Sequence, residues 1–105
     1  MLQKFDIYYR KDGKGFFGMH SSPLTLADIK DPEKFCYLQT VLAHAREDVF
    51  MMMQGEVWSP NGEARSLIQK LGLDHTSMSV GDVLRIVDDD VWYVCDMIGW
   101  KKVTE

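Results

Sequence analysis

The C-terminal third of the chain carries the pattern that most restricts the fold: two strand-like runs separated by three aspartates. The runs are VLRIV at 83–87 and VWYVCDMI at 91–98, and the aspartates are residues 88–90. Both runs are rich in β-branched and aromatic residues, which favour strands. So short a connection joins only antiparallel neighbours. We therefore expect a hairpin here, with GWKKV at 99–103 as a last short strand or bend.

A second hairpin is predicted at the N-terminus. In KFDIYYR, at 4–10, apolar residues alternate with mostly polar ones, which indicates a half-buried strand. The glycine-rich KDGKG follows, and FFGMH at 16–20 is predicted to return as the second strand. Residues 21–34 contain two prolines and are expected to form a connection with about one helical turn.

The clearest helix is predicted within SPNGEARSLIQKLG, at 59–72. Ala64, Leu67, Ile68 and Leu71 recur at helical spacing, so one face of the segment is apolar. Gly72 is well placed to end the helix in a left-handed conformation.

Residues 35–53, FCYLQTVLAHAREDVFMMM, are open to two interpretations. The spacing from Phe35 to Met52 favours a single long helix, with Asp31-Pro32 at its start. Alternatively, residues 37–43 form a strand, and a helix begins near Arg46 with acidic residues in its first turn. In either case Gly55 is expected to end the helix.

HTSMSVGDV, at 75–83, is the stretch that most resembles a chemical site. His75 beside Ser77 or Ser79 could suggest a small hydrolase, but a nucleophilic serine also needs an orienting acid and oxyanion donors. The chain has no G-x-S-x-G elbow. Hydroxyl groups in such a loop commonly bond to nearby backbone amides instead. We therefore predict a structural turn and no catalytic residue. Its members are Thr76, Ser77, Ser79, Gly81 and Asp82.

Composition narrows the class of protein. The 105 residues suit one domain, 1–105, and the net charge of −4 does not favour binding to phosphate backbones. Cys36 and Cys95 are too few for a zinc site and are expected to be buried reduced thiols. The aspartates at 88–90 are expected to form a solvated turn, so neither metal nor cofactor is predicted. The first residues lack a signal peptide's apolar run, and no stretch could span a bilayer, so we expect a cytoplasmic protein.

Two sets of residues are candidates for binding a partner. Three successive methionines at 51–53 cannot share one helix face, so some of this soft apolar surface should be exposed. The protein-binding candidates are Met52, Trp58 and Trp100. The alternative is a nucleic-acid surface of cations beside aromatic rings, made by Arg10, Lys11, Lys14, Lys101 and Lys102.

Residues 47–103 carry a family resemblance, most specifically in TSMSVGDV at 76–83 and in Gly99-Trp100. This pattern resembles a group of small uncharacterised proteins of bacteria, phages and plasmids, and it is similar to the YodL-like domain. The resemblance implies an accessory protein of a mobile element and no catalytic residues. It also implies a strand at YLQTV followed by a helix at REDVF, so for residues 35–53 we choose strand plus helix.

The sequence therefore predicts an α+β domain with an antiparallel sheet of about five strands, ordered as hairpin, strand, two helices and C-terminal hairpin. The predicted function is non-enzymatic binding of an unidentified protein partner. The first alternative is a nucleic-acid-binding module, because residues 80–100 are also similar to small PUA-like or ASCH-like barrels. A hydrolase using His75 and Ser77 ranks last.

Overall fold

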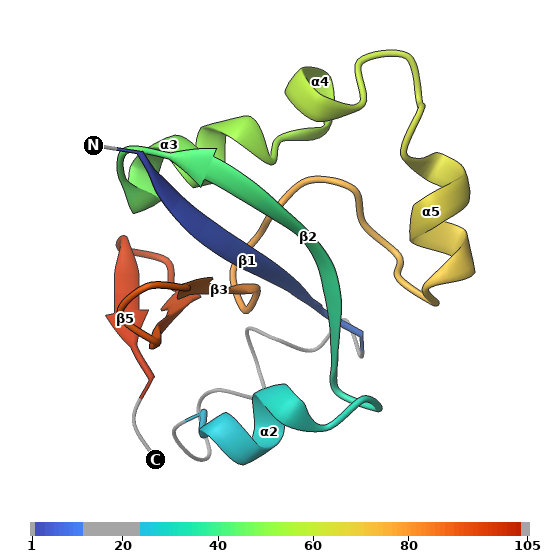
Figure 1. The fold of residues 1–105 in the computed structure, drawn as a ribbon. Helices are drawn as coiled ribbons and strands as arrows, with labels where there is room; N and C mark the ends of the chain where they lie inside the picture. The colour runs from blue at the N-terminus through green and yellow to red at the C-terminus, as the bar shows by residue number, and fades with distance from the viewer. Residues whose placement is uncertain (1, 12–23, 104–105) are drawn as a thin grey trace.

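A five-stranded antiparallel sheet forms the centre of the molecule in the computed structural model, which describes residues 2–11 and 24–103 (Figure 1). The strands lie in the order β2-β1-β3-β4-β5, and every neighbouring pair is antiparallel. The α+β prediction is confirmed. The strands are β1 (Gln3–Arg10), β2 (Phe35–Ala43), β3 (Val83–Ile86), β4 (Val91–Cys95) and β5 (Trp100–Lys102).

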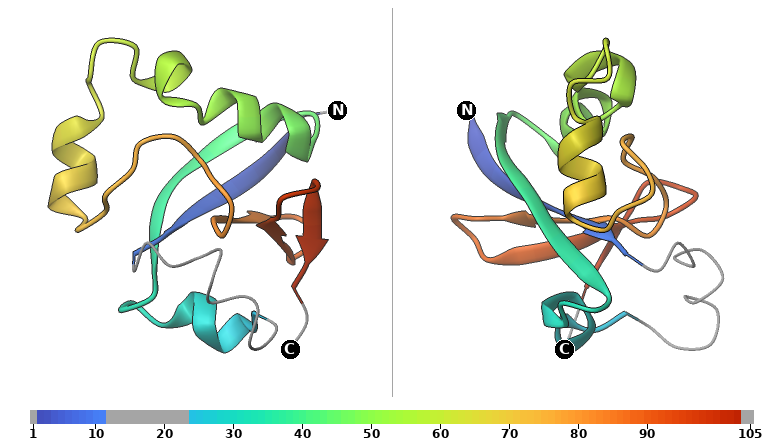
Figure 2. Two further views of the ribbon diagram at one scale, coloured as in Figure 1. Left: turned by 180° about the vertical axis from the view of Figure 1, so that it is seen from behind. Right: turned by 90° about the vertical axis from the view of Figure 1, so that its right-hand side faces the viewer.

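Four short helices pack around this sheet within the described residues. α2 (Leu26–Lys30) lies at one end of the molecule, and α3 (Arg46–Met52) and α4 (Gly55–Trp58) lie at the other, as both figures show (Figure 1, Figure 2). α5 (Arg65–Lys70) precedes the long loop that leads into β3. None of these helices is long and apolar enough to cross a bilayer.

Strand alternation divides the buried side chains between two hydrophobic clusters. Phe5, Ile7 and Tyr9 point to one face of β1 and pack in the larger cluster with residues of α3 and α5. Tyr8 points to the other face and packs against a smaller cluster that includes Ile29 of α2. Both faces of the sheet therefore bury apolar side chains, and β1 packs against a hydrophobic cluster on each side.

Residues 35–53 form a strand followed by a helix, so the choice between the two interpretations was correct. β2 pairs with β1 from Ala43–Gln3 to Phe35–Arg10, with an irregularity where β1 passes from Ile7 to Tyr8. This irregularity leaves Leu38 without an opposite residue on β1. The helical spacing was misleading because Phe35 and Leu38 belong to different clusters, and Leu42 is exposed.

One predicted helix boundary is wrong. Gly55 does not end α3: Met53 does so, and Gly55 is the first residue of α4. The helix start at Asp31-Pro32, which belonged to the interpretation not chosen, is absent, because Asp31 ends α2 and β2 begins at Phe35. The surroundings of Gly55 leave little room for a side chain. The Gly55 amide donates a 2.7 Å hydrogen bond to Ser77 Oγ, and a Cβ at this position would lie 3.1 Å from that oxygen.

The remaining predictions for local structure fare differently. α5 ends at Leu71, followed by Gly72 in the left-handed region at φ +74°, as predicted. The 83–98 hairpin is present, but β4 ends at Cys95 because the Asp96 amide donates a hydrogen bond to the Gly99 carbonyl and so begins a turn. The predicted strand at 16–20 lies outside the described residues.

Candidate functional site

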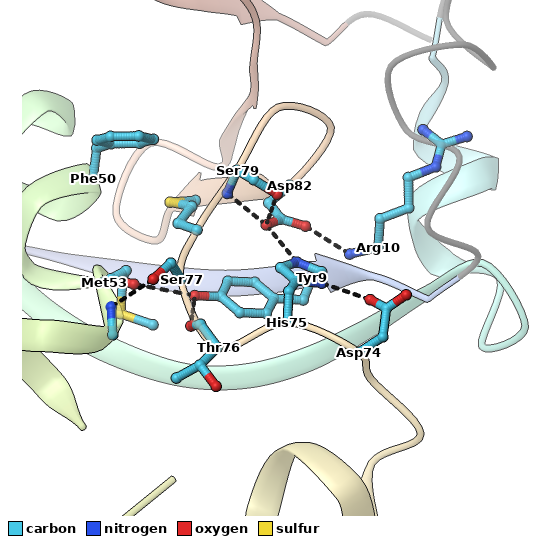
Figure 3. A network of polar contacts seen from close by, with 12 residues as sticks. Tyr9, Arg10, Phe50, Met53, Asp74, His75, Thr76, Ser77, Ser79 and Asp82 are labelled. Carbon is cyan, nitrogen blue, oxygen red and sulfur yellow. Dashed lines mark hydrogen bonds and ion pairs between the residues drawn. The ribbon is translucent and has the colours of Figure 1, made fainter. Parts of the chain in front are cut away.

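The loop from Asp74 to Asp82 is organised by the carboxylate of Asp82, which is 1% exposed (Figure 3). One carboxylate oxygen accepts a hydrogen bond from the Arg10 amide at 2.8 Å. The other accepts from the Ser79 amide at 2.9 Å and from His75 Nε2 at 2.8 Å. A buried charge is tolerated only when its hydrogen bonds and its counter-charge are supplied, and here both are present.

His75 is a cation held between two acids. Its Nδ1 lies 2.9 Å from Asp74 Oδ1, and its ring stacks on Tyr9 with centroids 4.7 Å apart. The hydrogen bond to Asp82 outweighs the opposing effect of burial and raises the pKa of His75 to about 9, with Asp74 adding to the rise. At neutral pH both ring nitrogens therefore carry protons that are donated to carboxylates. An imidazole in this state has no lone pair with which to activate a nucleophile.

The hydroxyl groups of the two candidate serines have other partners. Ser77 Oγ accepts the hydrogen bond from the Gly55 amide, and Ser79 Oγ lies 3.4 Å from the Asp82 carboxylate. Gly81 has a φ of +100°, and its amide donates a 2.9 Å hydrogen bond to the Cys95 carbonyl. The predicted turn residues thus lie together. The sequence indicated that Ser77 would bond to a nearby backbone amide. Its partner is instead the Gly55 amide at the start of α4, which is distant along the chain.

Thr76 takes part through its backbone. Its carbonyl oxygen accepts hydrogen bonds from the Tyr9 hydroxyl at 2.8 Å and from Trp58 Nε1 at 3.1 Å. Tyr9 is fully buried, and this burial raises the pKa of its phenol. The loop is therefore bonded to β1, to α4 and, through Cys95, to β4.

A pocket of about 380 Å³ lies elsewhere, between α3 and the turn that joins β4 to β5. α3 contributes Phe50 and Met51, and Trp100 at the start of β5 also lines the pocket. Cys95 lines it as well, and burial raises the pKa of this thiol to about 11, so the sulfur is an uncharged part of the wall. The full lining is Glu47, Phe50, Met51, Cys95, Asp96, Met97, Gly99 and Trp100.

The apolar wall of the pocket continues onto the surface. Met51 and Met97 are each 67% exposed, and Ile98 is 95% exposed. Two hydrogen bonds of Asp96 order the turn that presents Met97 and Ile98. Its carboxylate accepts from the Met97 amide, and its own amide donates to the Gly99 carbonyl. Gly99 adopts φ +75°, a conformation that glycine supplies at little cost. Exposed apolar surface on an ordered turn is typical of contact sites.

The three predicted protein-contact residues are in different surroundings. Trp100 lines the pocket. Met52 is half-buried against the larger cluster. The sequence predicted that at least one of the three methionines would be exposed, and that residue is Met51. Trp58 is half-buried and donates to the loop. Sequence reasoning did not identify Met97 and Ile98 as contact residues; the signal for them was an apolar pair directly before a glycine.

The four described cations of the nucleic-acid alternative are divided between two separate strands. Arg10 and Lys11 lie at the end of β1, whereas Lys101 and Lys102 lie in β5, with β3 and β4 between them. Alternation along β5 points Lys101 and Lys102 to opposite faces of the sheet. Lys14 lies outside the described residues.

One aspartate of the 88–90 turn is paired within the fold. Asp90 accepts a 2.8 Å hydrogen bond from Arg85 Nε while most of its side chain remains exposed, and this bond lowers the pKa of the carboxyl. In the part of the chain that the structure describes, no group of three or more His, Cys, Asp or Glu residues could hold a metal ion.

Comparison of the chain with protein-family models, with curated proteins and with solved structures found no match. The resemblance to the YodL-like domain therefore stays a prediction.

Proposed function

We propose that this chain is a non-enzymatic, cytoplasmic binding protein that receives an apolar side chain of a partner protein in the pocket between α3 and the β4–β5 turn. The observation that carries the proposal is that Met51 and Met97 line the pocket and are also exposed, with exposed Ile98 next to Met97 in the same turn. Methionine surfaces adapt to the shape of an incoming partner. The YodL-like resemblance supports the further expectation that the protein is an accessory of a mobile element.

The exposed rim favours a protein over a small molecule as the ligand. A volume of about 380 Å³ is in the range of small-ligand sites. However, a ligand contained in the pocket would leave Ile98 in water, whereas a protein surface can cover the pocket and its rim together. The non-enzymatic part of the proposal is supported by His75, the candidate base beside the two serines, because both of its ring nitrogens are bonded to carboxylates.

Met97→Asp tests the proposal, with Leu42→Asp as the matched control. Leu42 is 54% exposed but lies in β2, at the opposite edge of the sheet from β5. Each variant is used to capture partners from the cells that produce the protein, and the partner recovered is then purified and titrated. We expect Met97→Asp to raise the Kd at least tenfold, because it places a charge in an apolar contact, and Leu42→Asp to leave the Kd unchanged.

Equal affinity of wild type and Met97→Asp for the purified partner would refute this location of the site. Recovery of no partner by the wild type would count against protein binding itself.

A further inference from the structure

The charges in the pocket lining are of one sign. Glu47, in the first turn of α3, and Asp96, directly after β4, line the pocket, and every other lining residue is uncharged. The two acids come from opposite walls, one from the helix and one from the turn. An occupant of the pocket therefore meets an apolar surface with an acidic residue on each side.

No cation is among the described residues that line the pocket. Arg46 precedes Glu47 but lies over the Tyr93 ring, 4.1 Å from its centroid. Lys102 pairs across the sheet with Tyr93, so it is further along β5 from the Asp96–Gly99 turn than Trp100 is. Lys101 alternates to the other face of the strand. Glu47 and Asp96 are thus the charged residues that line the pocket beside Trp100.

We propose, building on the function proposed above, that the partner presents a basic apolar segment, with a large apolar side chain flanked by Lys or Arg. The apolar side chain enters between α3 and Trp100, and the flanking cations pair with Glu47 and Asp96. An acidic segment would place like charges together as it entered, so the same pocket selects against it. A chain of net charge −4 adds a favourable long-range field for such a partner.

The test is selection of ligands from a random linear-peptide library displayed on phage, with the wild-type chain as the target. A double variant, Glu47→Gln with Asp96→Asn, is selected in parallel; the asparagine keeps an oxygen that can accept from the Met97 amide. Circular dichroism checks that the variant is folded. Peptides from the wild-type selection are then synthesised and titrated against both proteins.

We expect the wild-type chain to enrich peptides in which Lys or Arg flanks an apolar residue. Their Kd should rise roughly three- to tenfold on the double variant, as for two partly exposed ion pairs, and added salt should reduce this difference. Replacing the cations of the peptide by Gln should cost the same factor against the wild type and little against the variant.

Peptides that require Met97 but show no basic bias, or that bind both proteins equally, would overturn the inference and leave the pocket as a binding site. If the chain itself dimerises in a way that Met97→Asp abolishes, the occupant is a second copy and the inference is wrong. If no selected peptide depends on Met97, both the inference and the proposed site fail.

Discussion

The loop 74–82 and the pocket beside β5 use their side chains in opposite ways. The loop is rich in groups that can do chemistry, yet each of its key groups is bonded within the fold: His75 and Ser79 to Asp82, and Ser77 to Gly55. The pocket is lined mostly by apolar residues, and two of them, Met51 and Met97, remain exposed. The comparison teaches that reactive residue types are weak evidence for a site until their hydrogen-bond partners are known.

The largest effect that separates the two regions is expected from Asp82→Asn. This change removes the charge that holds His75 and leaves the imidazolium without its closest counter-charge. Breaking a buried ion pair typically costs about 3–5 kcal/mol, so the urea midpoint should fall markedly. A change in stability under about 1 kcal/mol would show that the loop is not braced by this carboxylate.

The pH dependence of stability should come next in size. The pKa of His75 is about 9 in the folded chain, against 6.5 for the free side chain. Because the folded pKa is the higher one, this contribution is complete below pH 6.5 and is lost as the pH rises toward 9. It amounts to about 3 kcal/mol at most.

Urea unfolding measured across that window checks this, with His75→Asn as the control that should show a flatter profile. The window ends at pH 9 because Cys95, with its raised pKa of about 11, adds a loss of its own above that pH. A wild-type profile as flat as the control's would mean that His75 is neutral in the fold.

Trp58→Phe should have a smaller effect on stability. It tests whether Trp58 supports the loop 74–82 or belongs to the partner-binding surface. The indole donates to the Thr76 carbonyl, which Tyr9 also contacts, so the change removes one of two donors. We expect a loss of about 1 kcal/mol in the free energy of unfolding and no change in partner affinity. A weakened partner affinity with unchanged stability would place Trp58 in the contact surface instead.

The smallest effect on stability is expected from Met97→Asp, the variant with the largest expected effect on binding. The Met97 side chain is mostly in water in the free chain, so its replacement should change the free energy of unfolding by less than about 0.5 kcal/mol. Thermal unfolding of the purified variant measures this. A large destabilisation would mean that the exposed turn supports the fold, and the contrast between the two regions would be lost.

Much of the fold could be predicted from local pattern. The 83–98 hairpin and the α5 helix follow from β-branched content and from helical spacing, which are properties of a few adjacent residues. Residues 35–53 were ambiguous because their apolar spacing fits a helix, while β2 places Phe35 and Leu38 in different clusters around an irregular pairing with β1. The pairing of β2 with β1, a strand distant along the chain, overrides the local helical spacing. A short segment of sequence does not show which strand will pair with it.

The site was less predictable. Gly81-Asp82 marked a turn, but that Asp82 would hold both His75 and the amide of Arg10 depends on where β1 and β3 meet in register. Likewise Met97 and Trp100 are close in sequence, whereas their proximity to Phe50 depends on where α3 packs.

The sequence by itself determined the 83–98 hairpin, the α5 helix and the hydroxyl-rich turn before β3, because these follow from backbone preference and side-chain spacing over a few positions. The tertiary structure alone decided which polar groups are bonded within the fold and which apolar groups remain exposed. The physical reason is that both outcomes depend on contacts between residues far apart along the chain, and such contacts exist only once the strands have paired and the helices have packed.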